Sequence, residues 1–328
     1  MLSQQSSHLI TPNKNLVKMN NGLYGYADVG RFGLAHSLLA WARCIIWCRD
    51  NNLPIIAPNW RHFRLGPWLR GERDNRLYHR LFHFKYYIKG IDRMWLLSSQ
   101  KSWSAESIDP ESLIDKNENG IVVFRNLYSL NEESFFHQII GRGSQLLGEL
   151  EIITRPEFRP LIDSQPFIAL HVRMGDFSDG CLVEELRAGK KNSRLPISWY
   201  CNILEGLRKR VGQVRAIVVS DGSDSQLMEL LNLPDVSRSP AQPSISDLLT
   251  ITKSAALISS GSGFSMWGSF LGEVPRVCFP GQRLIRVFGD PIDCDYEPEV
   301  EDASHLNDDF ISRVIMMMNR RESQLVCP

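Results

Sequence analysis

The sequence lacks the signals of several large classes of protein. Its 37 basic and 37 acidic side chains balance, so it has no cationic excess of the kind on which general binding to nucleic acid depends. The N-terminal residues contain no long apolar core that would indicate a secretory signal. The most apolar helix candidate, residues 34–48, is too short to span a bilayer and contains Arg43. We therefore expect a cytoplasmic protein with no nucleic acid partner and at most peripheral association with the inner face of a membrane.

The signatures of thiol chemistry and of dinucleotide binding are also missing. The seven cysteines are scattered and none forms a Cys-x-x-Cys pair, so we expect free cysteines in a reducing compartment rather than a metal site or disulfides. No Gly-x-Gly-x-x-Gly turn occurs, and no Gly-Lys-Ser/Thr follows a glycine-rich loop. These absences disfavour an NAD-type oxidoreductase and a P-loop protein.

The second half of the chain alternates short apolar runs with helix signals. The predicted strands, each apolar enough to be covered on both faces, are residues 167–172, 214–220, 255–260 and 275–280. The predicted helices are residues 195–210, 223–231, 244–254 and 264–272. Pro196 lies near a predicted helix start, and Ser244 and Asp247 have the spacing of a capping box. This alternation predicts an open, mostly parallel, doubly wound sheet.

The first half begins in the same way and becomes less regular. Its predicted strands are residues 22–29, 53–58 and 121–124, and its predicted helices are residues 34–48 and a start within 131–140. Residues 59–101 are rich in arginine and aromatic side chains, which suits either a surface that stacks on sugar rings or an irregular insertion. The proline-rich stretch Arg155–Pro166 is the best candidate linker. We predict an N-terminal domain over residues 1–160 and a C-terminal domain over residues 161–328.

Two doubly wound domains would bind ligands at the carboxyl ends of their strands. The turn after the first predicted strand consists of Gly30, Arg31, Phe32 and Gly33 and leads into a helix. Glycines allow the backbone to approach a ligand closely, and a helix N-terminus attracts anions. Taken alone, this turn is more simply interpreted as structural.

A second strand end carries charge. His171, Arg173 and Asp176 stand at the end of strand 167–172, where the arginine fork would suit the oxygens of a diphosphate. Asp176 could fix the arginine or the loop after Gly175. The equally good alternative is a buried Arg–Asp ion pair beside a core histidine whose hydrogen bonds are satisfied.

Two further strand ends complete the set. Asp221 could accept hydrogen bonds from a guanine edge or a ribose, or it could cap the helix that begins near Ser223. The loop after strand 255–260 could cradle phosphate with amides and hydroxyls, or it could be a capped turn. The residues of that loop are Gly261, Ser262, Gly263, Phe264 and Ser265. Four such ends in one chain favour a nucleotide diphosphate ligand.

The order of these motifs resembles that of the alpha-1,2-fucosyltransferases, a glycosyltransferase family 11-like group related to the protein O-fucosyltransferases. The matching stretches are HVRMGD, LPISWY, VVSD and SDLLTITKSAALISSGSGFSMWGSFLG, together with GRFG and LPIIAPNW in the first half. They cover residues 22–60 and 165–282. Four motifs in the same order are far more specific than any one of them.

The resemblance implies a GT-B-like α/β fold, with two Rossmann-type domains facing a cleft, and inverting, metal-independent transfer of fucose from GDP-fucose to a glycan hydroxyl. No cofactor is expected, and the partners would be a GDP-sugar donor and an oligosaccharide or glycan acceptor. Arg173 would hold the β-phosphate, His171 would shape the same pocket, and Asp221 would lie near the guanosine. Ser262 to Ser265 would meet the phosphates, and Gly30 to Gly33 would approach the donor from the other domain.

The sequence departs from the family pattern at two places and leaves the general base open. Met174 stands where the family often has a second arginine, and Leu34 and Ala35 stand where it usually has asparagine and glutamine. Because of these departures, two alternative functions remain open. One is a transferase that uses another GDP-sugar, and the other is a non-catalytic protein that binds nucleotide-sugars or glycans. The candidates for the base that deprotonates the acceptor are Asp179, Glu184 and Glu185, which could equally be solvated loop charges.

Overall fold

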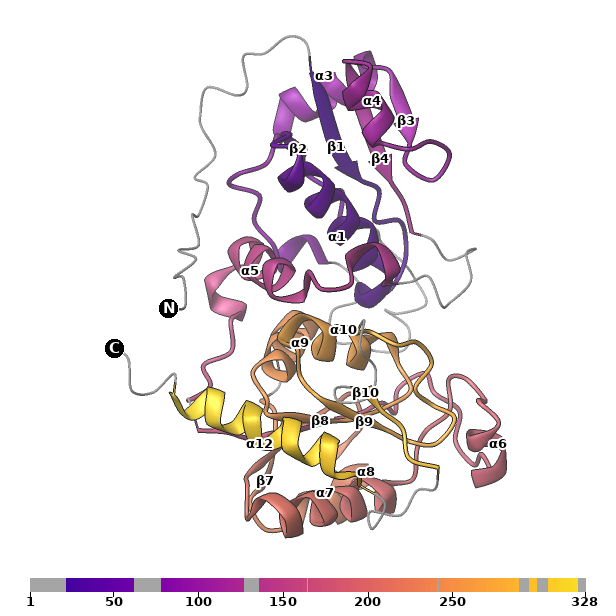
Figure 1. Ribbon diagram of the computed structural model, residues 1–328, viewed down its shortest axis with the longest axis vertical. Coiled ribbons are helices and arrows are strands. Elements are labelled where there is room, and N and C mark those ends of the chain that lie inside the picture. The colour runs from indigo at the N-terminus through magenta and orange to yellow at the C-terminus, as the bar shows by residue number, and fades with distance from the viewer. Residues whose placement is uncertain are drawn as a thin grey trace.

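Two parallel sheets organise the chain into an N-terminal and a C-terminal domain (Figure 1). The computed structural model describes residues 22–61, 78–126, 136–163, 165–240, 242–288, 295–299 and 306–323. Both sheets have helices on their two faces, which confirms the predicted α/β class with two Rossmann-type domains. The predicted boundary at residue 160 falls between the last strand of the first sheet and the first strand of the second, and it stays a prediction.

The N-terminal sheet has the strand order β2-β1-β4-β3, and every pair in it is parallel. Its strands are β1 (Leu23–Ala27), β2 (Ile55–Ile56), β3 (Ser102–Ser104) and β4 (Gly120–Phe124). Helix α1 (Leu34–Asp50) packs on one face and α3 (Gly90–Ser99) on the other. The other helices described in this half are α4 (Glu111–Asp115) and α5 (Gly143–Ile153), with the 3-10 turns η2 (Tyr78–Arg80), η4 (His137–Ile139) and η5 (Pro156–Phe158).

The C-terminal sheet is also parallel and has the order β10-β9-β8-β5-β6-β7. Its strands are β5 (Ile168–Val172), β6 (Ala216–Ser220), β7 (Val236–Arg238), β8 (Ala256–Ser259), β9 (Arg276–Cys278) and β10 (Asp295–Tyr296). The chain runs outward from β5 to β6 and β7, and then returns to place β8 on the other side of β5. The strand order therefore reverses between β5 and β8, and open α/β sheets bind ligands at such a reversal.

Helices cover both faces of the C-terminal sheet. These helices are α6 (Val183–Arg187), α7 (Ile197–Val211), α8 (Asp224–Leu231), α9 (Ser244–Thr252), α10 (Gly263–Gly272) and α12 (Asp308–Ser323). Alternate residues of β5 enter different cores, because Leu170 packs with residues of α7 and α12 whereas Ala169 packs with α9. Continuous burial on both faces explains why this strand reads as one apolar run.

The two domains share part of their core. Trp267 and Phe270 of α10 pack against Phe136 of the N-terminal domain, with ring centroids 5.0 and 4.8 Å from that of Phe136. The indole N–H of Trp267 donates to the carbonyl oxygen of Ala35 in α1, at 2.6 Å. Gly143 of α5 lies so close to α10 that a Cβ atom would overlap the Phe270 carbonyl. An apolar seam therefore joins α10 to α1 and α5.

Two sequence-based predictions about helices are wrong or fall partly outside the described residues. Helix α9 begins at Ser244 with Pro243 at its N-cap, so Ser244 and Asp247 form no capping box. The Asp247 carboxylate instead accepts hydrogen bonds from Ser239 and Gln242, which lie before the helix. The helix start predicted within 131–140 is a 3-10 turn at His137–Ile139 where it is described, and residues 131–135 lie outside the described part.

Candidate functional site

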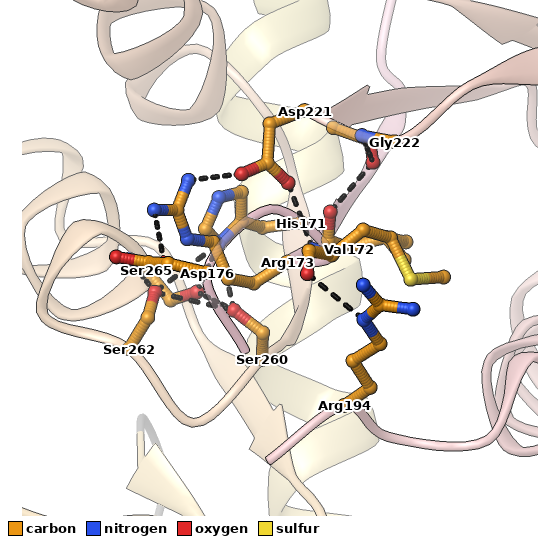
Figure 2. Close-up of polar contacts among 12 residues, drawn as sticks. His171, Val172, Arg173, Asp176, Arg194, Asp221, Gly222, Ser260, Ser262 and Ser265 are labelled. Atoms are coloured by element: carbon orange, nitrogen blue, oxygen red, sulfur yellow. Dashed lines mark hydrogen bonds and ion pairs between the residues drawn. The ribbon is translucent and has the colours of Figure 1, made fainter. Parts of the chain in front are cut away.

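Three of the four predicted strand ends meet where the strand order reverses. The loop after β5 carries Arg173, and the loop after β8 carries the serines that precede α10. Asp221 follows β6, the neighbour of β5 on its other side. Because all of these strands are parallel, their carboxyl ends lie at one edge of the sheet and bring these side chains together (Figure 2).

Arg173 lies between two carboxylates. Its Nη1 donates to Asp221, and its Nη2 donates to Oδ1 of Asp176 at 2.6 Å (Figure 2). The guanidinium also lies over the ring of Phe177, with Cζ 5.7 Å from the ring centroid. The arginine side chain keeps 27% of its surface exposed, and these two bonds occupy two of its five N–H groups, so donors remain for an anion.

The alternative interpretation of His171, Arg173 and Asp176, a buried Arg–Asp ion pair beside a core histidine, is therefore partly right. Arg173 does form Arg–Asp ion pairs, but they are half-exposed rather than enclosed in the core. Asp176 does fix the arginine, as one version of the prediction required. Asp221 does not cap a helix, because Ser223 is the N-cap of α8 and forms a capping box with Gln226. Asp221 instead accepts the N–H of Met174 at 2.8 Å and orders the loop after β5.

Asp221 stays negatively charged although its side chain is partly buried. Burial by itself would raise the pKa of this carboxyl group, but the Arg173 charge and the backbone N–H groups of Met174 and Gly175 outweigh burial and lower it. The Asp221 carboxylate is therefore ionised at neutral pH. An arginine held in place by a permanently charged partner is already oriented when a ligand arrives.

His171 is buried and bound to serines of the loop after β8. Its Nδ1 lies 2.6 Å from the Oγ of Ser265 and 2.8 Å from the Oγ of Ser260, with Ser262 further away at 3.4 Å. The imidazole ring packs against Phe264, with centroids 5.0 Å apart. His171 is thus the contact that fixes the loop after β8 to the end of β5.

Burial, together with the nearby Arg173 charge, lowers the pKa of His171 to about 3. The imidazole is neutral in the folded protein at neutral pH, whereas the unfolded chain takes up a proton near pH 6.5. Because the unfolded state binds more protons between these values, this contribution to stability is complete above pH 6.5 and is lost as the pH falls toward 3.

We expect His171→Asn to flatten the acid limb of the stability profile. Between pH 6.5 and about 3 the free energy of unfolding of the wild type should fall faster than that of the variant, by up to about 1.4 kcal/mol per pH unit. Urea unfolding at a series of pH values measures both slopes. Parallel profiles for the two proteins over this range would show that His171 does not titrate as described.

The N-termini of α1 and α10 face each other across the two domains. Ala35 of α1 lies against Gly263 of α10, where an added Cβ atom would be 3.3 Å from the Ala35 Cβ. Ser262 caps α10 by accepting the N–H of Ser265, so the predicted alternative of a capped turn is observed. A capped helix start still presents backbone N–H groups, and two helix N-termini close together favour an anion between them.

The glycine turn of the N-terminal domain has the predicted tight geometry. Gly30 adopts a φ of +61°, and the ring of Phe32 folds back over it so closely that a Cβ atom would be 2.7 Å from the ring. Arg31 and Phe32 are exposed at the tip of the turn. Gly33 is the N-cap of α1, and the first N–H of that helix, on Leu34, donates to the hydroxyl of Tyr78 at 2.9 Å.

Two glycines beside Arg173 provide a matched test of this geometry. A Cβ atom on Gly175 would overlap the Asp221 carboxylate, with Cγ of Asp221 at 3.2 Å, whereas a Cβ atom on Gly222 would meet the flexible Met174 side chain, with its Cγ at 2.8 Å. We expect Gly175→Ala to cost roughly 1–3 kcal/mol of stability and Gly222→Ala clearly less. Urea unfolding compares them, and equal losses would show that Asp221 is not held in this position.

Two of the three departures from the family pattern are buried, and the third is half-buried. Met174 packs in the core of the C-terminal domain, and Leu34 packs in the core that α1 shares with the sheet. Ala35 is half-buried and contributes its carbonyl oxygen to the Trp267 indole. None of the three offers a polar side chain to the site, so any polar contact expected at these positions must come from elsewhere.

The three candidate general bases lie in the segment that follows the motif. Asp179 pairs with Arg194 at 3.1 Å, and Glu185 pairs with Lys190 at 2.9 Å while accepting the N–H of Leu182. Glu184 is exposed on α6. The local ion pairs match the interpretation of Asp179 and Glu185 as surface charges, and the identity of a base stays a prediction.

Sequence reasoning missed several residues of the site. Arg194 donates from Nε to the carbonyl oxygen of Met174 at 2.9 Å and supports the loop after β5 (Figure 2). Ser220 donates to the carbonyl oxygen of Val172 at 2.6 Å and ties β6 to the same strand end. Ser220 and Ser260 had a usable signal, since each is the last residue of a predicted strand, whereas Arg194 follows no predicted strand.

Metal ligands were not expected, and the described part of the chain contains no group of three or more histidine, cysteine, aspartate or glutamate side chains placed to hold an ion. The further expectation that the sequence has no Asp-x-Asp triplet is wrong, because one stands at residues 293–295. Asp295 is buried in an ion pair with Arg276, and residue 293 lies outside the described residues. Metal-free chemistry stays a prediction.

Among the described residues, no helix is long and apolar enough to cross a membrane.

These features define a two-domain α/β protein of Rossmann type with a site suited to an anionic ligand. No protein-family model matches the sequence, and a comparison with curated proteins finds no match. Among solved structures, the chain is similar to NodZ alpha-1,6-fucosyltransferase co-crystallised with GDP, at a TM-score of 0.44 and 15% identity over 77% of this chain and 92% of that one. A further NodZ structure in this group is from Bradyrhizobium.

Two other similar structures are also fucosyltransferases by name. A variant of Arabidopsis thaliana FUT1 in complex with GDP gives a TM-score of 0.44 and 8% identity, over 80% of this chain and 72% of that one. POFUT1 in complex with GDP gives a TM-score of 0.39 and 11% identity, over 79% and 98%. Similarity this low carries no argument about activity, so the function must be argued from the motifs and the site.

Proposed function

We propose that this protein is a glycosyltransferase that moves fucose from GDP-fucose to a hydroxyl group of a glycan. One observation carries the proposal, namely that Arg173 stands half-exposed at the point where the strand order reverses, beside the N-terminus of α10. A guanidinium and a helix N-terminus at such a position suit a nucleotide diphosphate. The ordered motifs of the sequence add the fucosyltransferase resemblance to this geometry.

The proposed chemistry uses the charge of Arg173. Breaking a bond between a sugar and a diphosphate builds negative charge on the departing nucleotide while the sugar becomes positive. A fixed guanidinium and aimed N–H groups stabilise that charge more strongly in the transition state than in the ground state, which accelerates the reaction. Asp176 and Asp221 hold the guanidinium in place, so it need not reorganise during the reaction.

The finer parts of the proposal come from the family resemblance. They are inversion at the anomeric carbon, an alpha-1,2 linkage and independence from metal ions. Arg173 would contact the β-phosphate, and Ser262, Gly263, Phe264 and Ser265 would line the phosphate end of the donor site. The turn Gly30–Gly33, which lies on the neighbouring domain, would face the donor and the acceptor.

A donor screen tests the proposal. We expect GDP and GDP-fucose to raise the thermal unfolding midpoint by several degrees, since a ligand at about 100 times its Kd stabilises a protein by about 2.7 kcal/mol. UDP-sugars and dTDP-sugars, which have the same diphosphate but a different base, should not. Stabilisation by UDP-sugars would contradict the donor assignment, and stabilisation by another GDP-deoxysugar alone would redirect it to that donor.

A second function is favoured by the burial of Met174 and Leu34 at positions where the family has polar side chains. On this alternative the protein binds a nucleotide-sugar or a glycan without catalysing transfer. It predicts stabilisation by GDP-fucose together with no release of GDP, whichever acceptor is supplied. Release of GDP that depends on an acceptor would exclude it.

A further inference from the structure

Helix α3 presents an apolar face to solvent. Ile91, Met94 and Trp95 are 84, 67 and 56% exposed, and they lie on one side of the helix because they are three and four residues apart. The opposite side is used for packing, since Leu96 is buried against the N-terminal sheet and Arg93 donates to the carbonyl oxygen of Ala57 at 2.8 Å. The exposed face is therefore not needed to hold α3 on the domain.

Cations border the start of this helix. Lys89 is its N-cap residue, and Lys85 lies four residues earlier, next to the exposed Tyr86. Burial and the charges of Arg159, Arg155, Lys85 and Lys89 together lower the pKa of His83. The charges of the two lysines, which precede α3, and of the two arginines, which follow α5, therefore all act on His83.

Little negative charge pairs with these four cations in the described part of the chain. Arg155 and Arg159 are held near His83 by the backbone, because the N–H of His83 donates to the carbonyl oxygen of Ile153 at 2.7 Å and Nη2 of Arg159 donates to that of Thr154 at 3.2 Å. Within the described residues, the one ion pair that these four cations make is between Arg155 and Glu157, at 3.9 Å. One further carboxylate, Asp92, lies in the first turn of α3.

An exposed apolar helix face beside lysines matches the chemistry of one kind of partner. Anionic lipid headgroups attract lysines, while tryptophan, isoleucine and methionine side chains enter the boundary between headgroups and acyl chains. We propose that the N-terminal domain docks on an anionic lipid bilayer through α3 and the two lysines that come before it. This docking surface consists of Ile91, Met94, Trp95, Lys85 and Lys89. It leaves out the two arginines, because their segment meets α9 of the C-terminal domain, where Ser246 donates to the carbonyl oxygen of Phe158 at 2.7 Å.

The position of α3 allows docking without blocking the site. Figure 1 shows α3 at the end of the N-terminal domain that is remote from the C-terminal domain. The loop after β8, which belongs to the site, lies instead against α1, because a Cβ atom on Gly263 would be 3.3 Å from the Ala35 Cβ. A protein held by α3 therefore keeps its nucleotide site accessible. The inference does not depend on the donor, so its failure would leave the proposed function standing.

Co-sedimentation of the full chain with vesicles tests the inference. The wild type should bind vesicles of phosphatidylcholine containing about one-third phosphatidylglycerol roughly tenfold better than vesicles of phosphatidylcholine alone, and added salt should weaken the difference. Replacing Ile91, Met94 and Trp95 by serine should reduce binding by roughly tenfold or more, as should Lys85→Glu with Lys89→Glu. Thermal unfolding checks that these variants fold.

A matched control comes from the C-terminal domain. Met228 and Met316 are exposed apolar side chains on α8 and α12, and Met228→Ser with Met316→Ser should leave vesicle binding unchanged. The exposed face of α3 could instead bind a second copy of the chain. Sedimentation velocity of the wild type and of the triple serine variant tests for such a dimer. The inference would be overturned if the wild type formed a dimer that the triple variant dissociates. It would also be overturned if the wild type bound neither vesicle type or bound both equally, or if the triple variant bound as well as the wild type.

Discussion

Arg173→Ala is expected to lower the rate of GDP release from GDP-fucose by roughly a hundred- to a thousandfold. The reason is that the variant loses the guanidinium that would offset charge on the departing diphosphate, and it removes the positive charge between Asp176 and Asp221. Two carboxylates without the arginine would repel a diphosphate, so binding of GDP should weaken as well. Turnover with purified protein and calorimetric titration with GDP measure the two effects.

Arg215→Ala is the matched control for this experiment. Arg215 precedes β6 at the opposite edge of the same sheet, pairs with Asp163, and is exposed to nearly the same degree as Arg173, at 30%. Its removal should leave turnover and GDP binding unchanged. Arg173→Lys keeps a positive charge but loses the planar fork, so it should retain part of the binding and little of the turnover. Turnover at the wild-type level in Arg173→Ala would refute the role assigned to this arginine.

Arg276→Met is expected to destabilise the protein by about 3–5 kcal/mol. Arg276 and Asp295 are both fully buried, and Nε and Nη2 of the arginine donate to the two carboxylate oxygens at 2.8 and 3.0 Å. The same Nη2 also donates to the carbonyl oxygen of Ile285 at 2.6 Å. Removing the arginine would leave a buried carboxylate without its counter-charge. Urea unfolding measures the loss.

A double variant distinguishes the effect of an unpaired buried charge on stability from the effect of losing the packed volume of the two side chains. In Arg276→Met with Asp295→Leu no charge is left behind, so the double variant should be clearly more stable than Arg276→Met alone. Because the pair joins β9 to β10, far in sequence from Arg173, the double variant should keep most of its affinity for GDP. A single variant within about 1 kcal/mol of the wild type would mean that water reaches the pair.

The central strands and the helices between them could be predicted from the sequence. Strands β5, β6 and β8 are buried on both faces, so each one is a continuous apolar run. Strands β3 and β7 were not predicted because they are short edge strands whose residues are largely half-buried or exposed. Helix α3 was also missed, since an exposed apolar face obscures the periodicity by which an amphipathic helix is identified.

The candidate site was predictable only where residues follow a strand. His171, Arg173 and Asp221 could be found because parallel topology places strand ends together. The pairing of Arg173 with Asp221, which are 48 residues apart, and the support of Met174 by Arg194 depend on tertiary packing. No local pattern predicts such contacts, so sequence reasoning left the choice between an ion pair and a ligand site open for Arg173, and the structure shows that the ion pair comes with exposure to solvent.

The seam made by Trp267, Phe270 and Phe136 limits how the two domains can move. A hinge that swung the domains apart would expose these three rings to water and break the hydrogen bond from Trp267 to Ala35. Such an opening would carry the free-energy cost of unpacking a core, unlike motion across a polar domain interface. Admission of a ligand must then rely on rearrangement of loops at the mouth of the site, and the two halves should unfold together in a single cooperative transition.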